Sequence, residues 1–344
     1  MSGDGEDRRA GRRPSVLKAV GLALAGTLVA GCAAAGWAYW HLNSNIKSVD
    51  INSALGDDRP AKATPTPSAS DAAPLPTESV NILVLGSDSR SGRENQALGG
   101  GSSTGARSDT AMVVHIDAGR TTATVVSIPR DTLVTRPSCP LESGGDTAVS
   151  YGAMFNSAYA VGGPVCAVKT VESITDVRMD HYIEIDFSGF ARLVNALGGV
   201  TVTTDEDIDD ADSHLTLKAG THHLDGKQAL ALARTRHGIG DGSDLGRIGL
   251  QQRLVKALLE QISSTSLLTS PAKLYSVADA VTGSLTTDTG LDSLTELTTL
   301  GESLKGLAAD DVKTVTMPVV TAPSDPNRVV AEEPAASELW ESLR

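Results

Sequence analysis

Aromatic residues are scarce in this chain, at 3% of its 344 residues, and it has only three cysteines. So few aromatic rings argue against a protein that stacks on unpaired nucleic-acid bases. The 42 acidic residues outnumber the 29 basic ones, and the formal net charge of -13 argues against a general nucleic-acid binder, which would be basic. No Cys-x-x-Cys pair occurs, and neither does GxxxxGKS or GxxxxGKT. Neither a structural zinc site nor a P-loop nucleotide site is therefore expected.

The N-terminal region has the pattern of a membrane anchor. Residues 1–18 form a basic segment, and the stretch that follows, Ala19–Trp40, carries no charged residue. As a helix this stretch would be about 33 Å long, enough to cross the core of a bilayer. The basic flank favours the cytoplasmic side, and the aromatic residues at the far end suit the opposite interface. We therefore predict a single-pass protein of the cell membrane, with a cytoplasmic tail at 1–18, a transmembrane signal-anchor at 19–40 and the remainder outside the cytoplasm.

Two alternatives to an uncleaved anchor remain open. Small residues at 33–35 offer a cleavage site for a signal peptide. The sequence Val29-Ala30-Gly31-Cys32 resembles a lipoprotein cleavage box, which would make Cys32 a lipidated N-terminus. The apolar run continues beyond both positions to Trp40, and this favours the uncleaved anchor.

The remainder of the chain divides by composition and periodicity. Residues 41–78 are predicted to be an extracytoplasmic spacer, because proline, alanine, serine and threonine dominate the stretch Asp57–Thr77. From 79 to 320, short apolar runs typical of strands alternate with amphipathic helical patterns. This alternation predicts a single α/β domain with a mixed sheet. Residues 321–344 are predicted to be a polar C-terminal tail that can form a short helix at Ser337–Leu343.

An aspartate and an arginine stand together at three places where a predicted strand begins or ends. The pairs are Asp88 with Arg90, Asp109 with Arg107, and Asp131 with Arg130. Carboxylate oxygens are ligands for magnesium, and substrate phosphates usually complete such a site. Guanidinium groups match the remaining phosphate oxygens. A local turn would explain any one aspartate, but three such pairs predict a site for a diphosphate and a divalent cation.

A second arginine cluster flanks a loop rich in glycine and aspartate. Its members are Arg234, Arg236 and Arg247. Like charges repel unless an anion lies between them, so this cluster predicts a site for a highly charged phosphate group. The alternative is a solvated loop in which the arginines pair with Asp241 and Asp244.

Three other polar features have simpler explanations. The acidic stretch Asp205–Asp212 lacks the glycine turn and the terminal glutamate of an EF-hand, so we predict a solvated loop. His222 and His223 are adjacent and point in two directions, so no zinc site is predicted there. Cys139 and Cys166 bracket a loop and can form a disulfide if the domain is extracellular.

Taken in order, these segments resemble the LytR-CpsA-Psr family of bacterial cell-wall enzymes. The resemblance covers about 79–320. It rests on Leu85-Gly86-Ser87-Asp88-Ser89-Arg90, Arg107-Ser108-Asp109-Thr110, Ile128-Pro129-Arg130-Asp131, Asn156-Ser157-Ala158-Tyr159, Arg234-Thr235-Arg236, Asp244-Leu245-Gly246-Arg247 and Gln251-Gln252. It implies an α-β-α sandwich with a central mixed sheet and a hydrophobic tunnel for a polyprenyl chain. It also implies a membrane-anchored transferase that moves a glycopolymer, teichoic acid or another, from polyprenyl diphosphate to peptidoglycan and leaves a phosphodiester.

The resemblance implies roles for single residues. Asp88 and Asp109 would hold the metal ion, magnesium or alternatively manganese. The residues that would contact the diphosphate are Arg90, Arg107, Arg130, Arg234, Arg236, Arg247 and Gln251. The residues implied in catalysis are Arg107, Asp109, Arg130, Arg234, Arg236, Asp244 and Arg247, with Asp244 orienting the arginines near it. The proton acceptor is not assigned, and Asp88, Asp109 and Asp131 are its candidates.

The chain departs from the family's pattern at two places. Leu250 stands where the family often has a further arginine, which puts one phosphate contact in doubt. The loop 92–105 stretches the spacing between Asp88 and Asp109, which leaves the entrance of the substrate uncertain. Two other activities remain as alternatives: a pyrophosphatase that uses water as its nucleophile, and a binding or regulatory protein for lipid-linked glycans that does no chemistry.

Overall fold

The computed structural model describes residues 16–57, 59–62, 78–87, 108–141, 143–236, 244–264 and 270–344, and of residues 16–26, 28, 109, 244 and 264 it describes the backbone alone. Within these ranges, seven strands form one sheet in the order β1-β12-β7-β2-β3-β4-β13. Their bounds are β1 Lys47–Val49, β2 Val80–Ser87, β3 Ser108–Ile116, β4 Ala123–Ile128, β7 His181–Asp186, β12 Leu285–Asp288 and β13 Val312–Thr316. β2 is parallel to β7 but antiparallel to β3, so the central sheet is mixed, as the sequence predicts.

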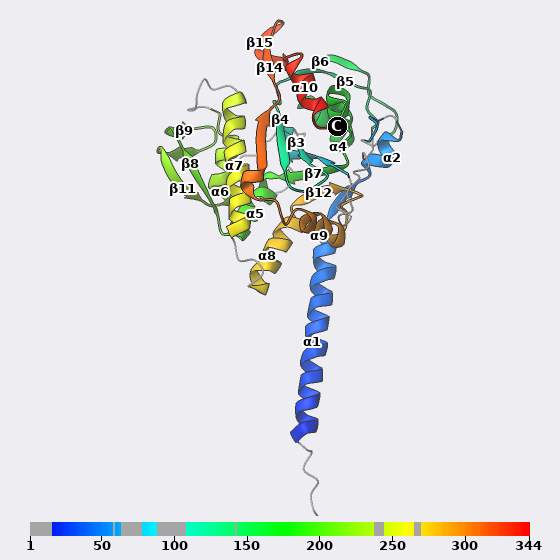
Figure 1. Cartoon of the computed structure of the whole chain (residues 1–344), viewed down its shortest axis with the longest axis vertical. Coiled ribbons are helices and arrows are strands. Elements are labelled where there is room, and N and C mark those ends of the chain that lie inside the picture. Colours follow the sequence, from blue (N-terminus) through cyan, green and yellow to red (C-terminus); the bar gives the residue numbers. More distant parts are fainter. Residues whose placement is uncertain are drawn as a thin grey trace, which may run out of the picture.

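Helices pack on both faces of this sheet (Figure 1). Their bounds are α1 Val16–Asn45, α2 Ile51–Leu55, α4 Ser157–Thr175, α5 Phe187–Leu197, α6 Gly226–Arg234, α7 Asp244–Ser264, α8 Pro271–Thr282, α9 Leu294–Ser303 and α10 Ala335–Glu341. Successive side chains of a strand point to opposite faces. Leu83 and Leu85 therefore pack in the main core with residues of α2, α4 and α10, whereas Ile82 packs with α9 on the other face.

A second hydrophobic cluster joins α5, α6 and α7 to two small antiparallel pairs of strands. The pairs are β8 Val200–Thr204 with β11 Gly220–Leu224, and β9 Ile208–Asp210 with β10 Leu215–Leu217. Leu250, Leu254 and Ala257 occupy one face of α7 in this cluster, at the spacing that an amphipathic helix requires. The cluster holds α6 against α7, so their positions relative to each other are fixed by packing.

The N-terminal segment differs from the spacer predicted for residues 41–78. α1 is separated from β1 by Ile46 alone, and β1 pairs with β12 as an edge strand of the central sheet. α2 follows, and its Ile51 and Leu55 are buried in the main core. Farther along, Arg59 forms a buried ion pair with Glu172 of α4, at 2.5 Å between Nη2 and Oε1. The proline-rich composition begins only after these apolar residues, which is why the stretch before it folds with the domain.

α1 extends away from the rest of the domain (Figure 1). Among the residues whose side chains are described, no helix is both long enough and apolar enough to span a membrane. The anchor at residues 19–40 stays a prediction.

The C-terminal residues also belong to the folded domain, which differs from the polar tail predicted for 321–344. They contribute most of the hairpin of β14 Val319–Ala322 and β15 Asp325–Ala331, and all of α10. Ala336, Trp340 and Leu343 of this segment are buried in the main core. Ala336 and Trp340 lie one turn apart on the same face of α10, and Leu343 follows just beyond its end. A segment that is polar on average therefore still packs through a few apolar side chains.

Cys139 and Cys166, which the sequence analysis pairs, form a disulfide between α4 and the loop after β5 Leu133–Arg136. Both side chains are fully buried. β5 pairs with β6 Ser150–Met154, which leads into α4. Gly162 makes room for the disulfide, because a Cβ atom there would lie 2.7 Å from the Cβ of Cys166.

Asp288, at the end of β12, joins that strand to β7. Its carboxylate accepts hydrogen bonds from the backbone amides of Tyr182, at 2.8 Å, and Gly290, at 2.6 Å, and lies 3.2 Å from Nδ1 of His181. Burial alone would raise the pKa of Asp288, but the bonds from His181 and the two amides outweigh it and hold the pKa below its usual value.

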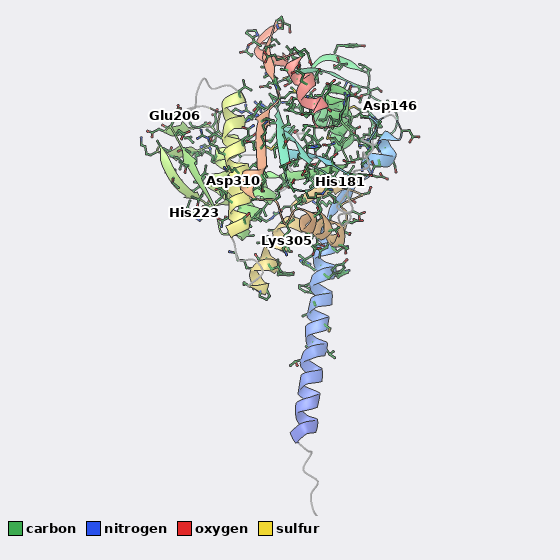
Figure 2. The ribbon with its side chains drawn as sticks, viewed as in Figure 1. Asp146, His181, Glu206, His223, Lys305 and Asp310 are labelled. Carbon is green, nitrogen blue, oxygen red and sulfur yellow. A yellow bond between two sulfur atoms is a disulfide. The ribbon has the colours of Figure 1, made fainter. Side chains whose placement is uncertain are left out.

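We expect Asp288→Asn to lower the free energy of unfolding by about 1–3 kcal/mol at neutral pH, because the amides lose a charged acceptor. The pKa of Asp288 is lower in the folded than in the unfolded protein. The stabilising contribution of its carboxylate is therefore fully present above the pKa of about 4 in the unfolded protein, and it is lost as the pH falls through the lower pKa of the folded protein. Urea unfolding at neutral and acidic pH should show the difference from wild type narrowing in acid. Asp310→Asn is the control, since Asp310 is exposed and lies away from His181 (Figure 2); a difference that stays constant with pH would contradict the assignment.

Candidate functional site: an arginine-lined cavity

A cavity of about 420 Å³ opens where the ends of several strands and helices meet. Of the described residues, five arginines and three aspartates line it. They are Arg130, Arg234, Arg236, Arg247 and Arg328, with Asp131, Asp210 and Asp212. Five positive and three negative side chains give this part of the lining a formal charge of +2, in a chain whose net charge is -13. The cavity therefore concentrates positive charge and suits an anionic ligand.

The directions of the strands explain why these residues meet. β2, β4 and β7 are parallel to one another, and β3 is antiparallel to them. The C-terminal ends of β2, β4 and β7 therefore lie on the same side of the sheet as the N-terminal end of β3. Arg130 lies just beyond β4, Phe187 directly follows β7, and Thr110 is near the start of β3. All three line the cavity. Ligands of open α/β sheets commonly bind at such an edge.

The pairing of β2 with β3 is irregular at Asp109. Gly86 pairs with Thr110 and Ser87 with Ser108, so Asp109 is the extra residue of a β-bulge. Its backbone therefore lies beside the last residues of β2, directly before the position of the other predicted metal ligand. Bulges are common next to active sites, where they change the direction of a side chain.

Arg234 ends α6, and packing at both ends of this helix positions it. The helix begins at a capping box on Asp225. Gly226 lies so close to α5 that a Cβ atom there would be 2.0 Å from the carbonyl oxygen of Ala191, so a larger residue would push the two helices apart. At the other end, the guanidinium carbon of Arg234 lies 4.9 Å from the centre of the Phe187 ring. This cation–π contact supports the arginine at the cavity wall.

Asp210 holds the backbone just after α6 against the loop that follows β9. Its carboxylate accepts hydrogen bonds from the backbone amides of Arg236, at 2.7 Å, Asp212, at 2.9 Å, and Ser213, at 3.2 Å. Thr235, fully buried between the arginines, forms a hydroxyl contact of 3.0 Å with Ser213. The prediction of a solvated loop for 205–212 is therefore wrong at Asp210, which is 2% exposed. An alternating strand, rather than a loop, buries this carboxylate.

Gln251 ties α7 to the two elements beside it. Its Nε2 donates to Oγ1 of Thr110 in β3 and to the carbonyl oxygen of Ala233 in α6, both at 2.9 Å. Arg247 lies one helical turn earlier on the same face and is 3% exposed. Leu250, in contrast, is buried in the hydrophobic cluster. The position where the family often has an arginine thus contributes an apolar contact here and does not line the cavity.

The structure brings together the predicted site residues that it describes in full. Those lining the cavity are Arg130, Arg234, Arg236, Arg247 and Gln251, together with the candidate base Asp131. Asp109 and Asp244 are described by their backbone alone, in β3 and at the start of α7. Asp88, Arg90, Arg107 and Asp241 lie outside the described residues. The metal site and two of the predicted phosphate contacts therefore stay predictions.

Other residues of the lining have no role in the sequence analysis, among them Arg328, Asp210 and Phe187. The sequence predicts a polar tail around Arg328 and a solvated loop around Asp210, whereas in the structure both residues line the cavity. The alternation Ile208-Asp209-Asp210 was an available signal for a strand that buries every second residue. For Arg328 the chain offers no local signal, because only the pairing of β15 brings it to the cavity.

The hydrophobic tunnel that the resemblance implies also stays a prediction. Next to the sheet, the described residues fill the main core with large side chains such as Phe155 and Tyr182. Within that core the hydroxyls of Tyr159 and Tyr182 each lie 2.7 Å from the carboxylate of Glu184. Burial raises the pKa of both tyrosines, and the charge of Glu184 adds to this, so they stay protonated donors.

His222 and His223 each contact a backbone carbonyl group. Their Nε2 atoms lie 2.7 Å from the carbonyl oxygen of Lys218 and 3.0 Å from that of Gly198. His223 lies at the outer edge of the domain (Figure 2). In the part of the chain with described side chains, no group of three or more His, Cys, Asp or Glu is arranged to hold a metal ion.

We expect Asp210→Asn to weaken the binding of magnesium pyrophosphate about tenfold, because an amide NH2 would face backbone N–H groups and loosen the position of Arg236. Isothermal titration calorimetry measures the affinity, and urea unfolding reports on the fold. Asp209→Asn is a matched control, since the neighbouring carboxylate is exposed and contacts only Thr216 among the described side chains. Equal losses in both variants would rule out a specific role for Asp210.

Comparisons with known proteins identify the family of this chain. A family model described as the LytR_cpsA_psr family matches residues 38–344. The probable cell wall biosynthesis protein LcpB of Corynebacterium glutamicum is 34% identical over 276 residues, which cover 78% of this chain and 62% of that protein. The polyisoprenyl-teichoic acid–peptidoglycan teichoic acid transferase TagV of Bacillus subtilis is 32% identical over 238 residues, 68% of this chain and 57% of that protein. The chain thus spans less than two thirds of the length of these two curated relatives.

A solved structure shows the same fold. The LytR-Csp2A-Psr enzyme from Actinomyces oris superposes with a TM-score of 0.61 at 23% sequence identity, covering 86% of this chain and 95% of that one. The family match also extends on both sides of the range 79–320 predicted from the sequence. This agrees with the folded segments around β1 and α10. From the extent of the family match and the identity to LcpB and TagV, the chain belongs to the LytR-CpsA-Psr family.

Proposed function

We propose that this protein is a phosphotransferase that moves a glycopolymer from a polyprenyl diphosphate carrier to peptidoglycan and leaves a phosphodiester link. One observation carries the proposal. Among the described residues, five arginines line a single cavity, although the chain as a whole is strongly acidic. Family membership supports it, and so does the name of TagV, which is a teichoic acid transferase acting on peptidoglycan.

In this proposal the arginines bind the diphosphate and spread its charge. Arg130, Arg234, Arg236 and Arg247 present planar donors that match phosphate oxygens. Before the substrate arrives, the Phe187 ring supports Arg234, and Asp210 holds the backbone amide of Arg236. Preorganised positive groups stabilise the charge that develops on the transferred phosphoryl group without reorganising during the reaction.

A divalent cation, magnesium or manganese, would complete the site through Asp88 and Asp109. The register of the sheet supports this pairing, because Asp109 forms a bulge beside the end of β2, and Asp88 is the next residue after that strand. The carboxylate oxygens of two aspartates are the hard ligands that these ions prefer. When bound, the ion would neutralise charge on the diphosphate.

The proposed transfer has one bond formed and one broken. A sugar hydroxyl of peptidoglycan attacks the phosphorus next to the glycan, and the bond from that phosphorus to the bridging oxygen breaks, so polyprenyl phosphate leaves. The hydroxyl proton passes to a carboxylate of the site, with Asp88, Asp109 and Asp131 as candidates. Asp131 lies 3.2 Å from the guanidinium of Arg328. Positioning and charge stabilisation supply most of the rate enhancement in such a reaction.

The proposed location is the cell membrane, with the signal-anchor at 19–40 and the domain outside the cytoplasm. A carrier with a polyprenyl chain lies in the bilayer, so an anchored domain meets it at the membrane surface. α1 leads almost directly into β1 of the central sheet, so the domain would sit close above the anchor rather than on a flexible spacer. The Cys139–Cys166 disulfide suits an oxidising extracytoplasmic compartment.

We expect Arg234→Ala to lower the rate of phosphodiester formation about 100- to 1,000-fold, because one preorganised charge at the phosphoryl group is lost. The assay combines the full chain in detergent with a polyprenyl diphosphate-linked glycan and peptidoglycan fragments. Arg253→Ala is the control, since Arg253 on α7 is exposed and pairs with Asp205 at 2.5 Å. Full activity in Arg234→Ala would count against the proposal.

The same assay separates the alternative functions. Acceptor-independent release of glycan phosphate would favour the pyrophosphatase, and binding without any product would favour the regulatory protein.

Removal of divalent ions with EDTA should abolish turnover, and magnesium or manganese should restore it, because the diphosphate then regains its counterion. Asp109→Asn should raise the magnesium concentration that gives half the maximal rate by about tenfold or more. Asp209→Asn, on the exposed side of β9, should leave that concentration unchanged. Turnover that persists at wild-type rate in EDTA would refute the metal assignment.

A further inference from the structure

The C-terminal hairpin supplies the cavity with an arginine that no motif of the sequence predicts. Arg328 of β15 lines the cavity, and its Nη1 lies 3.2 Å from Oδ1 of Asp131. The other oxygen of Asp131 lies 3.8 Å from Nε of Arg130. Asp131 therefore lies between two guanidinium groups, one from the end of β4 and one from the C-terminal region.

The position of Arg328 is set by packing on both sides of it. Its neighbour Val329 forms a bridge with Thr132, and the Val329 amide donates to the carbonyl oxygen of Asp131 at 3.5 Å. Farther along the chain, the amide of Glu332 donates to the carbonyl oxygen of Pro318 at 3.0 Å. Trp340 of α10 is buried in the main core and holds the end of the hairpin. Arg328 is thus presented by a fixed strand.

The ion pair of Arg328 with Asp131 is one that a substrate can replace. The Arg328 side chain is 30% exposed and that of Asp131 is 20% exposed. Partly exposed ion pairs contribute little to stability, because water screens them. A phosphate group offers more acceptor oxygens than one carboxylate, and it can take two parallel hydrogen bonds from a guanidinium group.

The hairpin also places Arg328 on a particular side of the cavity. Figure 1 shows β14 and β15 at the end of the domain opposite to α1. In the proposed function the carrier lipid lies on the side of α1, and the glycan extends away from it. Of the two phosphates in the carrier, the one bonded to the glycan is therefore the nearer to β15.

We propose that Arg328 binds the phosphate that stays on the glycopolymer, in exchange for its contact with Asp131, and so distinguishes the glycan side of the donor from its lipid side. This inference rests on the proposed function for the orientation of the substrate. It adds a binding residue from outside the segments that carry the family resemblance. It also assigns a function to the hairpin β14–β15, which otherwise only covers the end of the sheet.

The test compares two soluble monophosphates that stand for the two halves of the donor. N-acetylglucosamine 1-phosphate stands for the glycan side, and farnesyl phosphate for the lipid side. In the full chain in detergent, Arg328→Ala should weaken binding of the sugar phosphate about tenfold and leave farnesyl phosphate within about twofold, because one charged hydrogen-bonding group is lost. Arg328→Lys should fall between, since lysine keeps the charge but not the planar fork.

Arg344→Ala is the matched control, because Arg344 lies in the same C-terminal segment and pairs with Asp176 outside the cavity. It should leave both affinities unchanged. Equal weakening of both ligands by Arg328→Ala, weakening of neither, or the same effect in Arg344→Ala would overturn the inference. The urea midpoint of Arg328→Ala should match that of wild type, since both ion pairs that are lost, with Asp131 and with Asp325, are partly exposed.

The outcome is separable from that of the proposed function. Donor turnover adds a second readout, in which Arg328→Ala should raise KM for the donor more than it lowers kcat. If wild type makes no phosphodiester, but Arg328→Ala weakens the binding of the sugar phosphate and not that of farnesyl phosphate, the proposed transfer is refuted and the binding role of Arg328 stands. If wild type forms the phosphodiester, but Arg328→Ala does not selectively weaken binding of the sugar phosphate, the proposed transfer stands and the role of Arg328 is refuted.

Discussion

Electrostatic repulsion among the arginines of one cavity is the constraint on which the rest of the site depends. Guanidinium groups stay charged at every relevant pH, so each must be held in place by the fold. Arg234 rests on the Phe187 ring, the amide of Arg236 is bonded to Asp210, and Arg328 is paired with Asp131. The three lining aspartates offset part of the charge, and an anionic ligand would offset the remainder. Charged groups held in this way are in position before any anionic ligand binds.

The sheet supplies the rigid frame for this arrangement. Its mixed strand order brings the ends of β2, β4 and β7 to one edge together with the start of β3, and Gln251 of α7 then ties that edge to α6. The hydrophobic cluster behind α6 and α7 keeps both helices in register with the sheet. Loops alone would not hold like charges together, because their backbone yields to repulsion at little cost.

The ends of the chain complete the domain and relate the cavity to α1. β1 joins the sheet directly after α1, and the segment that contains β14, β15 and α10 closes the opposite end (Figure 1). An anchor at 19–40 would therefore hold the cavity at a set distance and orientation, whereas a flexible spacer would let it sample many. A transferase with one substrate in the bilayer and the other in the wall would benefit from such a fixed orientation.

Local patterns determined much of this protein. The alternation of strands and helices predicted the mixed α/β domain, and the Arg-Thr-Arg segment with Arg247 and Gln251 predicted a phosphate site whose described members do meet in one cavity. Motifs succeed here because each depends on neighbours within a few residues. Arg328, Asp210 and Trp340 escaped prediction because their roles arise from contacts with distant segments: β15 against Thr132, Asp210 against the amide of Arg236, and α10 against the sheet. The average composition of these segments is polar, so it predicts that they are exposed. Only the tertiary structure decides which single side chain of each segment is buried or faces the cavity.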